Sequence, residues 1–409
     1  MTGKVSKRSR SAKFFAKQDA VLQAATLSLN SNGVRGMTLA DVARHFDMKP
    51  TAVAYYFPSK EKLAAACFLR AIEKYLQFID EAKRGLSLQK RIEILINCHF
   101  EFRKQVARGT EHDIARFDDL RALNDPVVTE AYIEMFRHMR TLFLEYLNLD
   151  RDKTAVHAHT HILIQTLHAS ALWLQRFDPS YYDRAAQRTL DILLHGIGKV
   201  PYKWEPILLS EMIEVVPEPS EGRETFLRAA TRLISEHGYR GASVEMISGE
   251  LNVTRGAFYH HIEDKDYLVE VCFNRTIDII RQALDAACKA DVDGRTQLIS
   301  LMHFLVEHQL HGNVPLLRYA TTSLPESMRQ RIEPKYQRNI IHMGSMICDG
   351  IADGSLRAID VQIAAEILVS RIVAAAELKS WLPTPLSSKA TEHFVRPIFE
   401  GICAPQHTA

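Results

Sequence analysis

The chain has 409 residues, of which 46% are hydrophobic and 24% charged, and its formal net charge is +2. This length is more than one hydrophobic core usually serves, and it favours two or more domains. The composition is that of an ordinary soluble globular protein. No run reaches the roughly 18 uncharged apolar residues of a membrane-spanning helix, so we expect a cytoplasmic protein without membrane contact.

Six cysteines are scattered along the chain without a Cys-x-x-Cys pair: Cys67, Cys98, Cys272, Cys288, Cys348 and Cys403. This pattern favours reduced, mostly buried thiols over a disulfide or zinc framework. Residues 1–18 carry basic side chains and no acidic ones, and no apolar segment follows that would make them a secretory signal. We expect a basic arm that lies along phosphates or enters a minor groove, or else a solvated tail.

Residues 19–66 have the pattern of a helix-turn-helix. The first helix has an apolar stripe of Val21, Ala25 and Leu29. It is expected to end at Asn32-Gly33, because glycine accepts the left-handed conformation that closes a helix. Thr38 is placed to cap a second helix, whose buried face is predicted to be Leu39, Val42, Ala43 and Phe46.

A short third helix is expected after the turn at Asp47. It begins at Lys49-Pro50-Thr51 and runs to Tyr56, because proline is tolerated in the first turn of a helix. Ser59 then has the position of an N-cap for a long connecting helix. Residues 67–199 continue as a helical domain, with helices predicted at 87–108, 112–123, 126–147, 152–176 and 181–195.

One helical face in this domain carries His157, His161 and His168. Histidines four residues apart can chelate a metal ion. However, no cysteine is nearby and no carboxylate completes a metalloenzyme pattern, so we expect no metal and no cofactor. These histidines either contact a polar ligand or, as the simplest interpretation, are ordinary interface or surface histidines.

Residues 200–220 contain four prolines, at positions 201, 206, 217 and 219, and are predicted to be a linker. The helix-turn-helix pattern then returns at a constant spacing of 205 positions, as from Gly33 to Gly238. The second unit spans residues 221–271, with Ser243 capping its second helix, Asn252 in the turn and Thr254 starting its recognition helix. Cys67 and Cys272 keep the same spacing, which favours a shared packing position.

Residues 272–409 are expected to form a second helical domain, with helices at 296–311, 315–323, 327–352, 361–381 and 389–401. The fold class expected from these elements is all-α, built from two consecutive copies of one unit.

Two motifs resemble the DNA-binding domain of the TetR family of transcriptional regulators. The first consists of Gly33, Gly36, Thr38, Tyr55-Tyr56-Phe57, Lys60 and Leu63. The second consists of Gly238, Gly241, Ser243, Phe258-Tyr259-His260-His261, Lys265 and Leu268. The resemblance implies a helical ligand-binding and dimerisation domain after each unit, and a four-helix interface made by the last two helices of each half.

By position, the resemblance nominates two sets of DNA contacts. They are Lys49, Pro50, Thr51, Tyr55, Tyr56 and Lys60 in the first unit, and Thr254, Arg255, Gly256, Tyr259, His260 and Lys265 in the second. Arg255 is the best candidate for reading a guanine, and both lysines are placed to hold phosphate. The tyrosine that the family places on the backbone is Tyr259 in the second unit but Ala54 in the first, while Phe57 and Ile262 are expected in the core.

Two unlike recognition helices in one chain suggest a single-chain reader of an asymmetric DNA site. Family members are ordinarily homodimers on a palindrome. We therefore expect the halves to pack as an internal pseudo-dimer, with a further homodimer possible.

The resemblance also implies a cavity for a small-molecule effector. Plausible lining residues are Phe102, Phe117, Phe136, Trp173, Tyr319, Met343 and Trp381. An apolar cavity with few polar anchors would suit a lipophilic effector.

The function expected is that of a repressor that the effector releases from double-stranded DNA, and not that of an enzyme. Alternatives are an activator, or a regulator with one active unit. An alternative of another class is a metal-dependent enzyme that uses the His157, His161 and His168 face. A helical partner-binding protein is disfavoured by the retained Lys60, Lys265 and Arg255.

Overall fold

The chain folds into helices, and the ends of many of them are set by local capping. The computed structural model describes residues 3–47, 49–144, 153–199, 203–213, 221–253, 264–311, 324–378 and 389–403. Within these ranges the backbone forms helices and one isolated antiparallel bridge between Gly198 and Leu356. None of these helices is long and apolar enough to cross a membrane. The all-helical prediction is confirmed.

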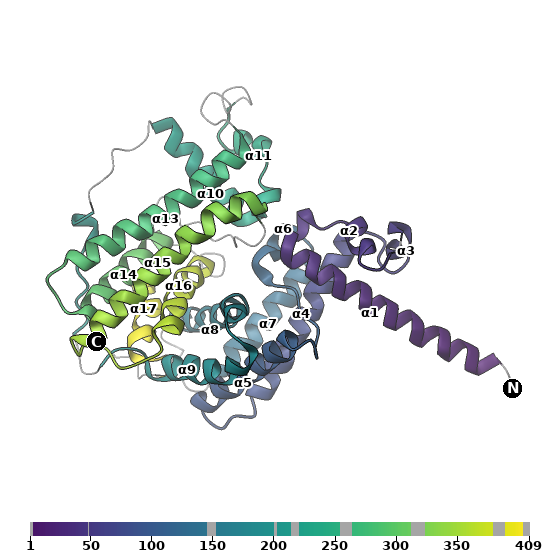
Figure 1. Cartoon of the computed structure of the whole chain (residues 1–409), viewed down its shortest axis with the longest axis horizontal. Coiled ribbons are helices and arrows are strands. Elements are labelled where there is room, and N and C mark those ends of the chain that lie inside the picture. The colour runs from purple at the N-terminus through teal and green to yellow at the C-terminus, as the bar shows by residue number, and fades with distance from the viewer. Residues whose placement is uncertain are drawn as a thin grey trace.

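The first half contains α1 to α9 (Figure 1). Their bounds are α1 (Gly3–Gly36), α2 (Leu39–Arg44), α3 (Pro50–Ala54), α4 (Lys60–Ala82), α5 (Leu88–Ala107), α6 (Leu120–Leu123), α7 (Pro126–Leu144), α8 (Lys153–Trp173) and α9 (Tyr182–His195). The backbone of the basic arm is the first part of α1, which projects away from the body of the molecule (Figure 1).

The second half repeats this order of helices. Its described elements are α10 (Glu221–Gly241), α11 (Val244–Glu250), α13 (Lys265–Lys289), α14 (Gly294–His311), α15 (Glu326–Ala352), α16 (Val361–Leu378) and α17 (Ala390–Glu400). The range 315–323, for which a helix was predicted, lies outside the described residues. In the proline-rich segment, Leu209 is buried and the amide of Ile207 donates to Ser300 Oγ at 2.9 Å, so this stretch is anchored on the second half.

Both helix-turn-helix units use the turn conformations that the sequence predicts. Gly33 and Gly238 interrupt α1 and α10 with φ values of 69° and 74°. Asp47 and Asn252, at the turns before the recognition helices, have φ values of 50° and 55°. Asparagine and aspartate tolerate this left-handed region better than most other residues with a side chain.

The predicted N-caps are also present. Thr38 Oγ1 accepts the Asp41 amide at 3.1 Å at the start of α2, and Ser243 Oγ accepts the Met246 amide at 3.2 Å at the start of α11. The long helices α4 and α13 are capped in the same way by Ser59 and Asp264. Each cap satisfies a backbone N–H that has no partner within its helix.

Two sequence expectations for the first half were wrong. Phe46 is 37% exposed, because it follows the end of α2 at His45 and leaves the buried stripe. The helix expected over 112–123 begins only at Phe117, as η1 (Phe117–Asp119) and α6. The preceding residues bond to Asn30 of α1 instead: Asn30 Nδ2 donates to the Ile114 carbonyl at 3.0 Å, and the Arg116 amide donates to Asn30 Oδ1 at 2.9 Å.

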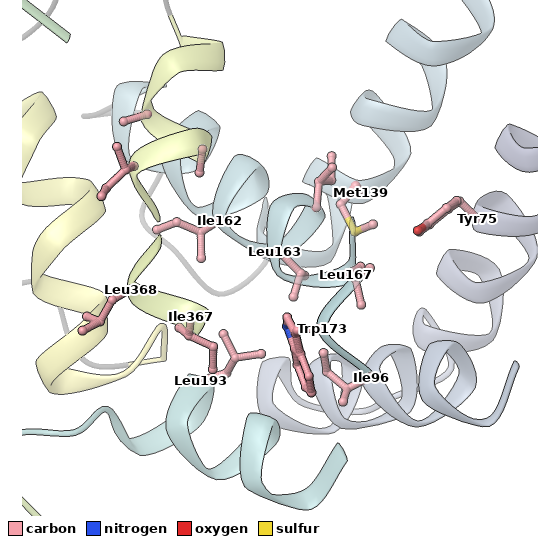
Figure 2. Packing of buried hydrophobic residues seen from close by; sticks show 14 of the residues in the cluster. Tyr75, Ile96, Met139, Ile162, Leu163, Leu167, Trp173, Leu193, Ile367 and Leu368 are labelled. Carbon is pink, nitrogen blue, oxygen red and sulfur yellow. The ribbon is translucent and has the colours of Figure 1, made fainter. Parts of the chain in front are cut away.

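The two halves pack against each other through α8 and α9 of the first and α16 and α17 of the second. Figure 2 shows Ile162 of α8 in one apolar cluster with Ile367 and Leu368 of α16. The burial of these aliphatic side chains supplies the main stabilisation of the contact, since each fully buried one contributes about 1.5–3 kcal/mol. One hydrophobic core therefore continues from the first half into the second.

The contact relates the halves by an approximate twofold symmetry. The Ile197 amide donates to the Ile398 carbonyl at 2.8 Å, and the Ile402 amide donates to the Leu193 carbonyl at 2.7 Å. Leu193 and Ile398 occupy equivalent positions in the repeat, as do Ile197 and Ile402. The same bond is thus made twice, once in each direction.

Gly196 and Gly401 allow this close crossing of the two chain segments. Their φ values are 64° and 90°. A Cβ on Gly196 would lie 2.2 Å from the Phe399 carbonyl oxygen, and one on Gly401 would lie 2.1 Å from the Leu194 carbonyl oxygen. Glycine is required at both positions by the positive φ and by the approach of backbone to backbone.

Unlike residues meet where the symmetric helices α8 and α16 cross. Arg371 of α16 is fully buried, and its Nη1 donates to Thr166 Oγ1 and to the Ile162 carbonyl of α8, each at 3.3 Å. Thr166 and Arg371 are equivalent positions of the repeat. Burial lowers the pKa of Arg371 to about 9, so a second arginine opposite it would be strongly unfavourable.

Cys67 and Cys272, which are 205 positions apart in the repeat, occupy equivalent packing positions. Cys67 Sγ lies 3.7 Å from the Leu22 carbonyl oxygen, and Cys272 Sγ lies 3.9 Å from the Leu227 carbonyl oxygen. Both are buried, and burial raises the pKa of Cys67 to about 11. A thiol in such surroundings is inert, which agrees with a packing role.

Candidate nucleic-acid interface and effector cavity

The first recognition helix, α3, is buried on one face and open on the other. Val53 is completely buried and Phe57 packs in the core, as expected. Lys49, which precedes the helix, and Pro50 and Thr51 in its first turn are exposed. The buried face fixes the helix to its domain, and its amino-terminal end remains accessible to a base edge in a major groove.

Aromatic residues join the end of α3 to the basic arm of α1. The ring of Phe14 lies 5.0 Å from that of Tyr56 and 5.9 Å from that of Tyr55, measured between centroids. Tyr55 is 73% exposed and therefore keeps most of its surface free for a ligand. The arm is thus positioned beside the recognition helix, a placement for which Phe14 gave no recognisable sequence signal.

Lys60 and Lys265 both begin long helices directly after their N-caps. Lys60 Nζ donates to the Arg35 carbonyl at 3.3 Å, and Lys265 Nζ lies 4.9 Å from the centre of the Tyr239 ring. A cation beside a helix N-terminus, where N–H groups also point outward, is a suitable arrangement for a phosphate.

Most of the contacts predicted for the second unit lie in residues 254–263, outside the described ranges: Thr254, Arg255, Gly256, Tyr259 and His260. The same holds for Ile262. The flanking elements α11 and α13 are described and have the same order and caps as α2 and α4. The nomination of these five residues stays a prediction.

A cavity of about 400 Å³ lies where the first half meets the second. Its walls come from η1, α6, α7 and α8 of the first half and from α10 and α16 of the second. Its lining includes Phe117, Arg121, Tyr132, His168, Ser235 and Glu377. The volume is within the range of small-molecule sites.

The cavity is more polar than the sequence suggested. Arg121 Nη2 and Glu377 Oε2 form an ion pair at 2.5 Å that joins α6 to α16. Burial lowers the pKa of His168 to about 4, so its imidazole is neutral at physiological pH. His168 Nε2 and Ser235 Oγ are buried and have no hydrogen-bond partner among the residues that the structure describes.

A family model described as "Bacterial regulatory proteins, tetR family" matches residues 21–67 and 226–272. Each match covers one helix-turn-helix unit, and the two are separated by the spacing of the repeat. The chain carries two TetR-type DNA-binding units in tandem. The predicted tandem duplication of the TetR unit is confirmed.

Several curated relatives of this chain are transcriptional regulators by name. It is 26% identical over 136 residues to the HTH-type transcriptional repressor AcnR of Corynebacterium diphtheriae, covering 33% of this chain and 64% of the relative. It is 30% identical over 95 residues to the Transposon Tn10 TetC protein of Escherichia coli, covering 23% and 47%. The chain thus spans about half to two thirds of the length of these relatives.

Among solved structures, the chain is similar to the ketosteroid transcriptional regulator KstR2 of Mycobacterium tuberculosis. The identity is 18%, the match covers 45% of this chain and 96% of the other, and the TM-score is 0.38.

Of the residues predicted to line a ligand cavity, Phe117 lines the large one. Phe102 lines a separate hollow of about 190 Å³. Phe136, Trp173 and Met343 are core residues; Phe136, for example, stacks on His161 with centroids 4.7 Å apart. Tyr319 and Trp381 lie outside the described residues. Apart from His168, the polar lining residues were missed because they come from distant segments and share no sequence pattern.

Three of the four histidines of α8 share the predicted face, and they lie in two different surroundings, because Phe136 packs on both His157 and His161. His157 lies 3.5 Å from Arg140 Nη1, His161 packs on Phe136, and His168 packs on Phe117 beside the cavity. The described part of the chain contains no group of three histidine, cysteine or acidic side chains that could hold a metal ion. Burial keeps the pKa of all three imidazoles below the usual value.

The wall of the cavity is bonded directly to the first helix-turn-helix. Asp119, which follows the cavity residues Phe117 and Asp118, accepts the Val34 amide at 2.5 Å. Val34 follows Gly33 and leads into α2. Burial raises the pKa of Asp119 to about 6. Any displacement of η1 would therefore be transmitted to the segment that positions α2 and α3.

Proposed function

We propose that this chain is a transcriptional repressor whose two unlike helix-turn-helix units read one asymmetric DNA site, and that a small molecule releases it. The observation that carries the proposal is the exposed amino-terminal end of α3, held by a buried face and flanked by the basic arm. The second unit has matching caps and a matching turn. The match of both units to the TetR family model gives independent support.

The proposed DNA-bound form is a single chain that acts as an internal pseudo-dimer. The paired bonds of Ile197 and Ile402 support this arrangement, because they relate the halves as two subunits of a symmetric dimer would be related. Arg371 of the second half faces Thr166 of the first half. Two second halves would place one buried arginine against another, so a first half is favoured to pair with a second half. A single chain is then enough for two recognition helices.

The effector proposed for the large cavity is amphipathic. The neutral imidazole of His168, the Arg121–Glu377 pair and the Ser235 hydroxyl stand beside the rings of Phe117 and Tyr132. A purely lipophilic molecule would leave the His168 imidazole and the Ser235 hydroxyl desolvated and without a hydrogen bond among the described residues, which costs about 1–3 kcal/mol for each.

Release from DNA requires that the effector prefer a conformation in which the recognition helices are displaced. The bond between Asp119 and Val34 offers a route for this coupling, since η1 is both a wall of the cavity and a support of the first helix-turn-helix. A ligand that pushes on Phe117 would shift α2 and α3 together.

The test is a binding selection with random duplexes and the pure full-length protein at low salt, followed by mobility shifts. Lys49→Ala in the first unit and Arg255→Ala in the second are each expected to weaken binding to the selected duplex about 5- to 100-fold, the loss of one base-edge contact. Lys83→Ala, at the far end of α4, is the matched control and should bind like the parent.

Failure to select any preferred duplex would overturn the proposal. If Lys49→Ala alone is without effect, the chain is a regulator with one active unit. Sedimentation of the complex separates the single-chain form, with one chain on an asymmetric duplex, from a homodimer, which would give two chains on a palindrome. A reporter gene downstream of the selected duplex distinguishes repression from activation.

A further inference from the structure

We propose that the large cavity is a composite effector site in which the ligand contacts the first half and the second DNA-binding unit at the same time. The ligand class that fits it is an uncharged ring compound bearing hydroxyl or carbonyl groups. This inference rests on the proposed regulatory function and deepens it.

The first observation is that α10, a helix of the second DNA-binding unit, forms part of the cavity wall. This helix packs on α6 and α1 of the first half (Figure 1). Its Ser235 reaches the same space as Phe117 and His168, and α16 adds Glu377. A ligand in this space is therefore in direct contact with a helix of the second DNA-binding unit.

The second observation is the pair of unsatisfied polar atoms. Among the described residues, His168 Nε2 and Ser235 Oγ lack hydrogen-bond partners although both atoms are buried. One comes from each half of the chain. Buried polar atoms normally have partners, so ligand groups able to donate or accept, such as hydroxyl or carbonyl groups, would complete them.

The aromatic surroundings define the rest of the ligand. The ring centroid of Phe117 lies 5.3 Å from that of Tyr132 and 5.0 Å from that of His168, which makes a wall of ring faces and edges. A flat ring is favoured against such a wall, because offset and edge-to-face contacts between rings are attractive.

The charges of the cavity discriminate against anions. Arg121 is already paired with Glu377, and Asp118, the second carboxylate of the lining, is paired with Arg116, so a ligand carboxylate would have to compete with both of them. A ligand carboxylate would meet these negative groups in a partly desolvated space, where like charges repel strongly. An uncharged ligand avoids this repulsion and leaves the bridge between the halves intact.

The experiment is ligand-observed NMR with the full-length protein and two matched panels, uncharged phenols and aryl ketones on one side and the corresponding aryl carboxylates on the other. Members of the uncharged panel are expected to bind at least tenfold more tightly than their carboxylate counterparts. Ser235→Leu should weaken that binding at least fivefold, whereas Gln77→Leu, at the separate smaller hollow, should leave it unchanged.

Glu377→Gln provides an independent test, because this variant should bind aryl carboxylates more tightly than the parent does. Removing this carboxylate frees Arg121, so aryl carboxylates should gain at least fivefold in affinity. Carboxylates that bind the parent as well as the neutral panel does would overturn the ligand class. Unchanged ligand affinity in Ser235→Leu, in protein that retains the parent's helical content, would overturn the composite site.

The composite site and the proposed regulatory function are tested by separate measurements. Ligand binding is measured without DNA, and DNA binding is measured by mobility shift without ligand. Intact recognition of a selected duplex together with no binding by either panel refutes only the composite site, whereas ligand binding without any preferred duplex refutes the regulatory role.

Discussion

Replacing Gly401 by alanine should weaken the contact between the two halves. The residue has a φ of 90°, and an added Cβ would lie 2.1 Å from the Leu194 carbonyl oxygen and 2.9 Å from the His195 amide nitrogen. Both neighbours are backbone atoms, so no change of side-chain rotamer can relieve the overlap. The two segments must move apart.

The expected cost follows from two contributions. Gly401 combines its φ of 90° with a ψ of 155°, a region that is essentially restricted to glycine, and holding alanine there costs about 1–3 kcal/mol. Separating the segments lengthens the bond from the Ile402 amide to the Leu193 carbonyl, now 2.7 Å, and a lost hydrogen bond costs about 1 kcal/mol net or more when its groups stay buried. We expect a total loss of about 2–4 kcal/mol.

A second glycine isolates the backbone contribution. Gly109 has a φ of 71°, and nothing lies within 4 Å of the position that its Cβ would take. Gly109→Ala should therefore cost only the conformational penalty, about 1–2 kcal/mol. The difference between the two variants measures the close crossing together with the stricter backbone conformation of Gly401.

The assay is urea unfolding of the full-length chain, followed by circular dichroism and by tryptophan fluorescence. Gly196→Ala should behave like Gly401→Ala, because its Cβ would lie 2.2 Å from the Phe399 carbonyl oxygen. If Gly401→Ala and Gly196→Ala unfold at the same urea concentration as Gly109→Ala, the symmetric crossing is not the tight contact inferred from these distances.

Three further changes have defined outcomes. Thr166→Val removes an acceptor from buried Arg371 and should cost about 1–3 kcal/mol in unfolding free energy; Thr160→Val, whose hydroxyl bonds only within α8 at 2.7 Å, should cost less. Burial raises the pKa of Asp119 to about 6, so the parent loses stability as this carboxyl ionises between pH 4 and pH 6. The unfolding free energy of Asp119→Asn minus that of the parent should therefore rise over this range, by up to about 1.4 kcal/mol per unit of pKa shift. A difference that does not change with pH would contradict this. Lys60→Ala should weaken binding to all duplexes alike and reduce the slope of affinity against salt by about one, measured by titration at several salt concentrations.

The sequence alone determined the repeated unit and the local structure of its helix-turn-helix. The caps at Thr38 and Ser243 and the positive φ at Gly33 and Asp47 depend on contacts within four residues, so a sequence pattern can predict them. The exception at Phe46 lies at a helix end, where one residue of difference moves a side chain out of the buried stripe.

The helix predicted over 112–123 was wrong because residues far away in the sequence determine the structure of that segment. A helix was predicted over 112–123 because its composition is helical, but Asn30, more than eighty positions away, bonds to Ile114 and Arg116 and holds the first part of that range extended. Tertiary hydrogen bonds override a weak local preference for helix.

Only the tertiary structure decided which distant side chains meet. Arg371 faces Thr166, and Ser235 and Glu377 close a cavity that begins at Phe117, because of the way in which α8, α10 and α16 cross. Helix crossing results from many weak packing contacts summed over both halves. No single residue encodes that sum, so the chemistry of the cavity appears only once the helices are packed.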